Sequence, residues 1–360
     1  MIPALKTRIL EDIALTGPIP LSRYMNLCLG DPVSGYYMTR DPFGTAGDFT
    51  TAPEVSQMFG ELIGAWLISA WQALGRPPRT RLAELGPGRG TLMADCLRSI
   101  TLEPEFLRGL EIDMVDISPV LVAAQKQKLS HVSCPISWHD SLPDSDLPTL
   151  LIANELFDAL PVHVLVKTKN YVAERHVTAS STDSLAFVDL PTTLQFAQPD
   201  IDDLPTGTVF ELSPERNDMA KHMASTFSAH GGAALMIDYG YVQPKTGVTF
   251  QAITDHQPVD PLQHPGEADL TALVDFTSLQ QSFKSGGVHV FGPVSQMDFL
   301  LDLGLLERAG QLGANQSEDV QAGLQQAVTR LVAPNEMGTL FKVLAATSFD
   351  TPLPGFQKPS

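Results

Sequence analysis

The spacing of apolar residues predicts that helices and short strands alternate along this chain. Leu5, Ile9 and Ile13 recur at helical spacing near the start, and a second short helix is predicted over 21–29. Helices that alternate with strands are typical of an α/β fold built on a parallel sheet. The predicted strands of this first half occupy residues 81–85, 110–116, 135–139 and 150–153.

Residues 51–75 have the pattern of one long helix with a buried face. Thr51 and Glu54 have the spacing of a capping box at its start, and Gly75 ends it. The segment from Gly47 to Thr51, at the end of an aromatic and glycine-rich loop, is interpreted first as packing and second as a cover over a ligand.

The second half of the chain continues the alternation after an interruption. Residues 162–209 predict a β-meander that is inserted before the next helix, and residues 241–270 predict a long loop that is a lid or disordered. The remaining elements are predicted as a helix over 214–227, a strand over 233–237, a helix over 276–283, a strand over 288–291, a helix over 296–303, a helix that begins at Ser317 and a strand over 340–346.

These elements divide the chain into seven consecutive segments. The division expected is an N-terminal helical segment with a ligand-covering loop, a first part of the core, the β-meander insertion, a continuation of the core, a lid or cap with helices, the last core strand and a tail. Their ranges are 1–75, 76–161, 162–209, 210–240, 241–335, 336–349 and 350–360.

Composition restricts the classes of function. The chain has 360 residues, 43% of them hydrophobic, and a formal net charge of −18. Such an acidic balance works against nucleic-acid binding, which depends on Lys and Arg. Cys28, Cys96 and Cys134 are scattered, which suggests a reducing compartment without disulfides. No signal peptide or membrane span is predicted, since the most apolar window is short and contains Glu61, so a cytoplasmic location is expected.

The segment from Arg81 to Asp95, RLAELGPGRGTLMAD, predicts a strand, a glycine turn and a helix. This arrangement forms nucleotide-type sites, because glycines let a ligand approach the backbone at a helix N-terminus. The residues Gly86, Pro87, Gly88 and Gly90 do not have the dinucleotide spacing G-x-G-x-x-G. Glu84 would repel a pyrophosphate and attract a cation, so S-adenosyl-L-methionine is the predicted ligand.

Three further strand ends carry candidate site residues. Asp116, with Ile117 beside it, lies where a carboxylate can accept both ribose hydroxyls, and the alternative is an exposed strand-end acid. Asp140 and Ser141 follow the third strand, where they could meet the adenine edge. Asn154, Glu155 and Asp158 follow the buried strand at 150–153 and are predicted to form the active site, with a helix N-terminus rich in acids as the alternative. His256 and His264 lack ligand spacing, so no metal site is expected.

Several segments together resemble the MidA-like methyltransferases, whose mitochondrial members are assembly factors for respiratory complex I. The resemblance covers nearly the whole chain in order. It implies a Rossmann-like class I methyltransferase fold with a seven-stranded sheet, an N-terminal helical segment and an inserted β-meander and helical cap. It also implies that S-adenosyl-L-methionine is bound. Asp116 stands where Glu is common in the family. The motifs are GDFTTAPEVSQMFGE (47–61), ELGPGRGTLMAD (84–95), VDISPVL (115–121), NELFDALPV (154–162), IDYGY (237–241), GEADLTALVDF (266–276) and MGTLFKVL (337–344).

The resemblance further implies symmetric dimethylation of an arginine on a complex I subunit. In this hypothesis Glu155 holds the guanidinium, Asp158 is its partner and Asn154 faces the cofactor; Glu211 and Asp269 are reserve candidates. The alternatives are a methyltransferase with another protein or small-molecule acceptor, a non-catalytic assembly chaperone that binds the cofactor, and an NAD(P)-dependent oxidoreductase. The expected partner is a protein acceptor, and a homodimer is an option because helix-rich caps often dimerise.

Overall fold

The computed structural model describes residues 3–42, 51–194, 204–243 and 245–356, which form two compact units. The first unit comprises Met1–Arg40, Asp158–Arg216 and Gln243–Leu273. The second unit comprises Asp41–Phe157, Asn217–Val242 and Val274–Ser360. Each unit is therefore assembled from segments that are distant in the sequence.

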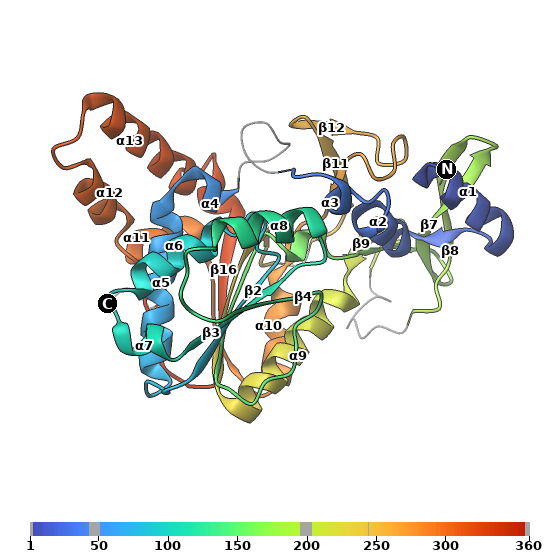
Figure 1. Ribbon diagram of the computed structural model, residues 1–360. Helices are drawn as coiled ribbons and strands as arrows, with labels where there is room; N and C mark the ends of the chain where they lie inside the picture. The colour runs from blue at the N-terminus through green and yellow to red at the C-terminus, as the bar shows by residue number, and fades with distance from the viewer. Residues whose placement is uncertain (1–2, 43–50, 195–203, 244, 357–360) are drawn as a thin grey trace. The chain divides into compact units, whose positions relative to one another are not determined.

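A mixed sheet forms the centre of the second unit (Figure 1). Its neighbouring strands are parallel from β4 to β10, whereas β16 is antiparallel to both β10 and β15. The predicted α/β class is confirmed. The sheet has eight strands, because the short β14 (Val274–Asp275) also pairs with β10. The other seven follow the order β15 (His289–Ser295), β16 (Phe341–Thr347), β10 (Gly232–Tyr241), β5 (Thr149–Asn154), β2 (Thr80–Leu85), β3 (Leu110–Val115) and β4 (Ile136–His139).

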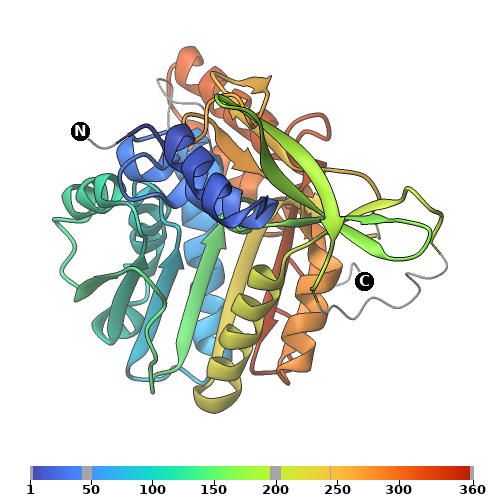
Figure 2. The ribbon, with the colours of Figure 1, turned by 90° about the vertical axis from the view of Figure 1, so that its right-hand side faces the viewer.

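Helices cover both faces of this sheet. Helices α9 and α10 lie in front of the strands in Figure 2, and α5 lies behind them. The strands β2 and β5 are buried along their whole length, as expected for strands between two helix layers. The helices that include residues of this unit are α4 (Ala52–Val55), α5 (Gln57–Ala73), α6 (Thr91–Ile100), α7 (Pro104–Arg108), α8 (Pro119–Lys128), α9 (Pro214–His230), α10 (Phe276–Ser285), α11 (Gln296–Asp302), α12 (Leu305–Gly313), α13 (Glu318–Val332) and α14 (Met337–Leu340).

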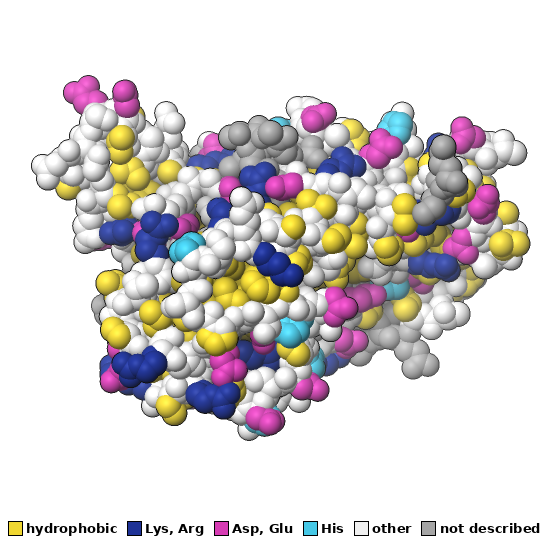
Figure 3. Space-filling view, in the orientation of Figure 1, with side chains coloured by type: hydrophobic (Ala, Val, Ile, Leu, Met, Phe, Trp, Pro, Cys, Tyr) yellow, Lys and Arg dark blue, Asp and Glu magenta, His cyan; other side chains and the backbone are white. Residues whose placement is uncertain are grey.

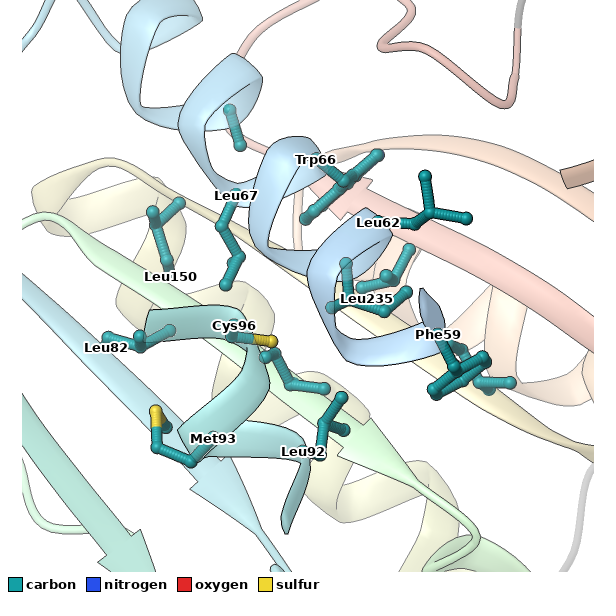
Figure 4. Close-up of a cluster of buried hydrophobic side chains, with 14 of the residues drawn as sticks. Phe59, Leu62, Trp66, Leu67, Leu82, Leu92, Met93, Cys96, Leu150 and Leu235 are labelled. Atoms are coloured by element: carbon teal, nitrogen blue, oxygen red, sulfur yellow. The ribbon is translucent and has the colours of Figure 1, made fainter. Parts of the chain in front are cut away.

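The hydrophobic core of the second unit lies between α5, α6 and the sheet. Trp66 of α5, Cys96 of α6 and Leu235 of β10 belong to this core, and Figure 4 shows them with their neighbours. The two helices approach closely at Gly60 and Gly64, where an added Cβ would lie 2.5 Å from Asp95 Cβ and 2.5 Å from the Cys96 carbonyl oxygen, respectively. Small residues here bring α6 and the glycine turn before it close against α5.

The predicted single helix over 51–75 is interrupted, and the predicted capping box is absent. Helix α4 ends at Val55, and Ser56 then caps α5 by accepting a hydrogen bond from the Met58 N–H at 3.2 Å. The Thr51 side chain makes no cap bond. The Glu54 carboxylate instead accepts a hydrogen bond from the Thr91 hydroxyl at 2.6 Å, so a contact with the glycine-turn helix replaces the local one.

The first unit combines helices α1 (Leu5–Thr16), α2 (Leu21–Gly30) and α3 (Tyr36–Thr39) with two sheets. In the five-stranded sheet the predicted meander is present as β6 (His163–Lys167), β7 (Val172–Ser181) and β8 (Ser184–Pro191). It is joined by β1 (Ile19–Pro20), which pairs with β7, and by β9 (Val209–Leu212), which pairs with β6. These two strands, of two and four residues, were not predicted from the sequence.

Residues 241–270 are more ordered than the predicted loop. They contain β11 (Gln251–Thr254) and β12 (Gln257–Val259), and β13 (Asp269–Thr271) completes a three-stranded sheet. Strands of three or four residues between prolines give almost no periodic signal, which explains the error.

Two kinds of feature are absent from the residues that the structure describes. None of their helices has the length and apolar character that a membrane crossing requires. Within these same ranges, no group of three His, Cys, Asp or Glu residues is placed to hold a metal ion. On the face shown in Figure 3, acidic and basic side chains are interspersed, and neither kind forms one continuous patch.

Candidate functional site

The glycine turn lies at the carboxyl end of β2, where ligands bind in open α/β sheets. Gly86, Gly88 and Gly90 have φ angles of 62°, 53° and 76°. These left-handed conformations favour glycine, which explains why glycine stands at all three positions. Gly90 is also the N-cap of α6, so the turn leads directly to the N-terminus of a helix, whose first N–H groups have no partner within the helix.

Glu84 is a buried acid at the end of β2, and only 2% of its surface is exposed. Its Oε2 atom has no hydrogen-bond partner among the described residues. Burial is the main cause that raises the pKa of Glu84 to about 8, and the charge of Asp116 adds to it. A buried carboxyl with an unused oxygen fits a cationic ligand group such as an ammonium.

Asp116 follows the neighbouring strand β3, and each of its oxygens has a donor. Oδ1 accepts from the Ser118 N–H at 2.9 Å, and Oδ2 accepts from the Gln125 amide at 2.8 Å. Burial raises the pKa of Asp116 to about 6, while these two hydrogen bonds lower it. Ser118 also caps α8, as predicted, and Ile117 between them exposes 54% of its surface. An exposed apolar side chain here is compatible with a flat ring above it.

The end of β5 places Asn154 and Glu155 beside the glycine turn. Glu155 has a φ of 50°, which is unusual for a residue other than glycine, and its N–H donates to the Ile237 carbonyl. Its Oε1 atom accepts hydrogen bonds from the Ala52 N–H and the Asn154 amide, each at 3.3 Å. Asn154 Oδ1 is buried and has no partner among the described residues. Unusual backbone conformations of this kind concentrate at functional sites.

A hollow of about 40 Å³ connects these two strand ends. It brings together Glu84, Asn154 and Glu155 with three residues of the turn, Gly86, Pro87 and Gly88. A nucleoside is much larger than this volume, so the hollow by itself cannot contain one. Of the other predicted residues, Gly90, Asp116, Ile117, Asp140 and Ser141 do not line this hollow.

Asp140 and Ser141 follow β4 at the edge of the sheet, and both are exposed. Their side chains lie within 3.4 Å of each other, a long hydrogen bond from the Ser141 hydroxyl to Asp140 Oδ1. A role at the adenine edge remains a prediction for both residues.

Asp158 and Asp269 belong to the first unit and are both buried. The Asp158 carbonyl oxygen accepts from the Ala272 N–H at 3.1 Å and from the Arg216 guanidinium at 3.2 Å. Asp269 Oδ1 accepts from the Tyr37 hydroxyl at 2.8 Å. The backbone around Asp158 is therefore fixed by hydrogen bonds, as is the Asp269 carboxylate.

The Glu211 carboxylate accepts hydrogen bonds from a neighbouring loop. Its Oε1 atom accepts from the Thr249 and Phe250 N–H groups, each at 2.8 Å, and its Oε2 atom accepts from the Thr249 hydroxyl. Three donors from one loop explain why an acid stands at this position. Glu211 is the weaker of the two reserve candidates for this reason.

Several residues of the site were not predicted as functional. Thr51, Pro53 and Glu54 line the hollow, although packing was preferred for the segment that ends at Thr51; the four residues before it, 47–50, lie outside the described residues. Arg89 also lines the hollow and forms ion pairs with Asp41 at 2.7 Å and Glu54 at 3.9 Å. These residues lie within two of the motifs that carry the family resemblance, but their residue types and spacing did not assign them a role at a ligand site.

A larger hollow of about 560 Å³ lies at the opposite, amino ends of β2 and β3. Arg76, Arg79 and Arg108 line it together with Glu105 and Glu111. Its arginines are exposed, and Arg79 is paired with Glu111 at 2.6 Å. Ligands of open α/β sheets bind at the carboxyl ends of strands, so the smaller hollow is the candidate site.

Comparisons with known proteins agree with this site. Residues 62–294 match the model of a family described as "Putative S-adenosyl-L-methionine-dependent methyltransferase". The chain is 37% identical to "Protein arginine methyltransferase NDUFAF7 homolog, mitochondrial" of Drosophila melanogaster, covering 95% of this chain and 84% of the relative. It is 36% identical to the human "Protein arginine methyltransferase NDUFAF7, mitochondrial", covering 94% and 82%.

Two solved structures of a Burkholderia thailandensis protein are also similar. The form bound to S-adenosyl-homocysteine has 28% sequence identity and a TM-score of 0.85, over 98% of this chain and 94% of that one. The native form has 27% identity and a TM-score of 0.82 over the same shares. The similarity therefore extends over both units of the chain.

The expectation of a cytoplasmic location is wrong in the light of these relatives, whose names assign them to mitochondria. That expectation relied on the scattered cysteines and on the lack of a predicted signal peptide or membrane span, and none of these identifies a compartment. A homodimer finds no support in the comparisons.

Proposed function

The chain belongs to a family of S-adenosyl-L-methionine-dependent methyltransferases, and we propose that it methylates arginine side chains of a protein. It is an enzyme that uses S-adenosyl-L-methionine as its cofactor. The relatives at 35–37% identity that are named protein arginine methyltransferases support an arginine acceptor.

The finer fold proposed is the seven-stranded class I methyltransferase sheet. The parallel order from β4 to β10 and the antiparallel β16 between β10 and β15 support it, with β14 as an addition. In this arrangement the cofactor lies across the carboxyl ends of β2 and β3.

The proposed cofactor contacts follow from the chemistry of each group. Glu84 binds the cationic amino-acid part, and the glycine turn from Gly86 to Gly90 lets the ligand approach the backbone. Asp116 accepts the ribose hydroxyls, and Ile117 packs on the adenine ring. Asp140 and Ser141 are proposed for the adenine edge, and the unused Oδ1 atom of Asn154 faces the ligand.

The proposed acceptor contacts centre on Glu155. S-adenosyl-L-methionine, when bound, supplies a methyl group on a positively charged sulfur. An arginine acceptor is protonated in water, and one of its nitrogens must present a lone pair. Glu155 and Asp158, three residues later in the chain, are proposed to accept hydrogen bonds from the other nitrogens and to concentrate the positive charge there. Positioning of the two reactants then supplies much of the reduction in the barrier.

The observation that carries this proposal is the position of Glu155 in the same hollow as Glu84. In this proposal the buried Glu84 faces the cofactor. Glu155, whose φ angle is positive, lines the same hollow. Symmetric dimethylation, and a respiratory complex I subunit as the acceptor, are proposed on the sequence resemblance described above.

A transfer assay tests the proposal. The protein is incubated with cofactor labelled on the methyl group and with arginine-containing peptides, and amino-acid analysis then identifies the modified residue. Glu155→Gln should lower turnover at least a hundredfold while the dissociation constant of S-adenosyl-homocysteine changes little, because the amide cannot neutralise the guanidinium. Glu84→Gln should weaken cofactor binding itself.

Three outcomes would contradict the assignment. Label on a residue other than arginine would identify a different acceptor. Cofactor binding without transfer to any peptide or to complex I subunits would favour the assembly chaperone. Full turnover in Glu155→Gln would remove Glu155 from the reaction.

A further inference from the structure

Gln125 is a buried amide in the second turn of α8 that contacts three neighbouring strand ends. It has no exposed surface. Its Nε2 atom donates to Asp116 Oδ2 and to the Gly88 carbonyl, each at 2.8 Å, and its Oε1 atom accepts from the Trp138 indole N–H at 3.1 Å. Gly88 belongs to the turn after β2, Asp116 follows β3, and Trp138 lies on β4.

These contacts use almost all of the hydrogen-bonding capacity of the Gln125 amide. A primary amide has two N–H donors and one carbonyl oxygen, and Gln125 uses both donors and the oxygen on groups that are fixed by the sheet. Gly90 lies against the same side chain, since a Cβ there would be in van der Waals contact with the Gln125 Cγ atom at 3.4 Å. A buried and fully connected group of this kind holds its partners in one arrangement.

We propose that Gln125 is a positioning residue for the ribose subsite, holding the Asp116 carboxylate against the glycine turn. The inference rests on the proposed role of Asp116 in cofactor binding. Gln125 itself does not meet the ligand, because its polar atoms are used within the protein. It couples the turn that the ligand approaches to the acid that accepts the ribose hydroxyls.

This role has a consequence for the charge of Asp116. The Gln125 donor is one of two hydrogen bonds that lower the pKa of Asp116 against the effect of burial. An ionised Asp116 accepts two ribose hydroxyls, whereas a protonated one loses an acceptor. Without the donor, Asp116 should bind a proton at a higher pH, and ribose binding should weaken there.

Other charged groups near Asp116 are accounted for. Glu84 on β2 interacts with Asp116 directly, and its pKa of about 8 keeps it protonated over the acidic range. On the neighbouring elements, His139 of β4 pairs with Asp113, Arg89 of the turn pairs with Asp41, and Lys128 of α8 contacts the Thr91 hydroxyl. Lys126 of α8 lies over the ring of Trp138.

The test measures the dissociation constant of 5′-methylthioadenosine between pH 5 and pH 8 by calorimetry. This probe has the ribose hydroxyls and lacks the ammonium group that Glu84 would bind. Gln125→Met keeps the length of the side chain and removes both hydrogen-bonding groups. It should weaken binding about tenfold at pH 7, equivalent to about 1.4 kcal/mol. The pH at which binding declines should rise by about one unit.

Two matched variants and one matched ligand complete the experiment. Gln127→Met changes an exposed glutamine on the same helix and should behave like the wild type. Trp138→Phe removes the donor to Gln125 Oε1 while it keeps an aromatic ring, and it should produce a smaller shift in the same direction. This variant keeps the test decisive if Gln125→Met fails to fold. The 2′,3′-dideoxy form of the probe should bind equally to wild type and Gln125→Met.

The results separate this inference from the proposed function. An unchanged pH profile in both Gln125→Met and Trp138→Phe, or an equal loss of affinity for the dideoxy probe, would overturn the positioning role. Asp116→Asn provides the reference: if it binds the probe as tightly as the wild type, the proposed ribose contact itself is wrong. If Asp116→Asn weakens binding and Gln125→Met does not, only the role of Gln125 is wrong.

Discussion

Glu84 and Asp116 stand at the carboxyl ends of neighbouring parallel strands, and the charge of Asp116 adds to burial in raising the pKa of Glu84 to about 8. At neutral pH Glu84 therefore holds a proton, while Asp116, with a pKa of about 6, is mostly ionised. The two acids differ in protonation although they share one edge of the sheet. This difference leads to two predictions.

Cofactor binding at pH 7 should release about one proton. A cationic ammonium next to Glu84 favours the ionised carboxylate, so its pKa falls on binding and the proton leaves. Calorimetric titration with S-adenosyl-homocysteine in two buffers of different ionisation enthalpy measures this number. Glu84→Gln should release none, and release should vanish in the wild type near pH 9. Equal release by both proteins would contradict the placement of the ammonium.

The stability of the ligand-free protein should decrease relative to Glu84→Gln as the pH rises. The folded-state pKa of about 8 exceeds the ordinary value of 4.5, so the folded protein binds this proton more tightly than the unfolded chain. The resulting stabilisation is complete below pH 4.5 and is lost as the pH rises through 8. Glu84→Gln should therefore gain on the order of 2–4 kcal/mol over the wild type between pH 5 and pH 8. Thermal and urea unfolding of both proteins at pH 5 and pH 8 measures this difference. If the stability of the wild type and of Glu84→Gln changes equally with pH, the prediction is wrong.

Replacing Gly64 should loosen the contact between α5 and α6. An added methyl group would lie 2.5 Å from the Cys96 carbonyl oxygen, which is backbone and cannot move aside. Gly64→Ala should lower the free energy of unfolding by about 1–3 kcal/mol in urea titrations. Gly323→Ala in α13 is the matched control, because nothing lies within 4 Å and alanine favours the helix. It should raise the stability by about 0.5–1 kcal/mol. A loss of the same size in both variants would rule out the steric explanation.

Arg308 should contribute more to stability than an exposed arginine. Its Nε atom lies 2.8 Å from Oε2 of Glu61, whose side chain is only 5% exposed. Arg308→Met leaves a buried carboxylate with weaker partners and should cost about 1–2 kcal/mol. Arg330→Met removes the exposed pair with Glu336 and should cost less than about 0.5 kcal/mol. If both variants lower the free energy of unfolding equally in chemical unfolding, burial of Glu61 does not strengthen its ion pair.

Much of the second unit could be predicted from the sequence, because residues that are close together in the chain determine its turns, strands and helix starts. The glycine turn needs three left-handed residues in a row of five, and only glycine supplies them readily, so Gly86, Gly88 and Gly90 mark the turn unambiguously. The buried strand β5 contains the continuous apolar run from Leu150 to Ala153, and β2 contains the shorter apolar set Leu82, Ala83 and Leu85. Ser118 before Pro119 correctly predicted the start of α8.

The predictions that failed depended on contacts between distant residues. Thr51 and Glu54 have capping-box spacing, but the hydroxyl of Thr91 is a better partner for Glu54 than a local N–H group. Gln125 resembles any other polar residue on a helix until the fold brings Gly88 and Trp138 to it. Spacing along the chain carries no information about such partners.

The left-handed backbone of Glu155 affects how changes at this position can be interpreted. For a residue with a Cβ, this conformation costs about 1–2 kcal/mol, and it costs more for a β-branched side chain. Alanine would therefore remove the carboxylate and keep the strain, whereas glycine would relieve the strain as well. Backbone geometry therefore restricts which residues fit at position 155, and the proposed role of Glu155 would restrict them further. Glycine or asparagine is the expected residue at this position in a non-catalytic relative, because both tolerate the left-handed conformation. Valine or isoleucine there would indicate that the loop has a different backbone conformation.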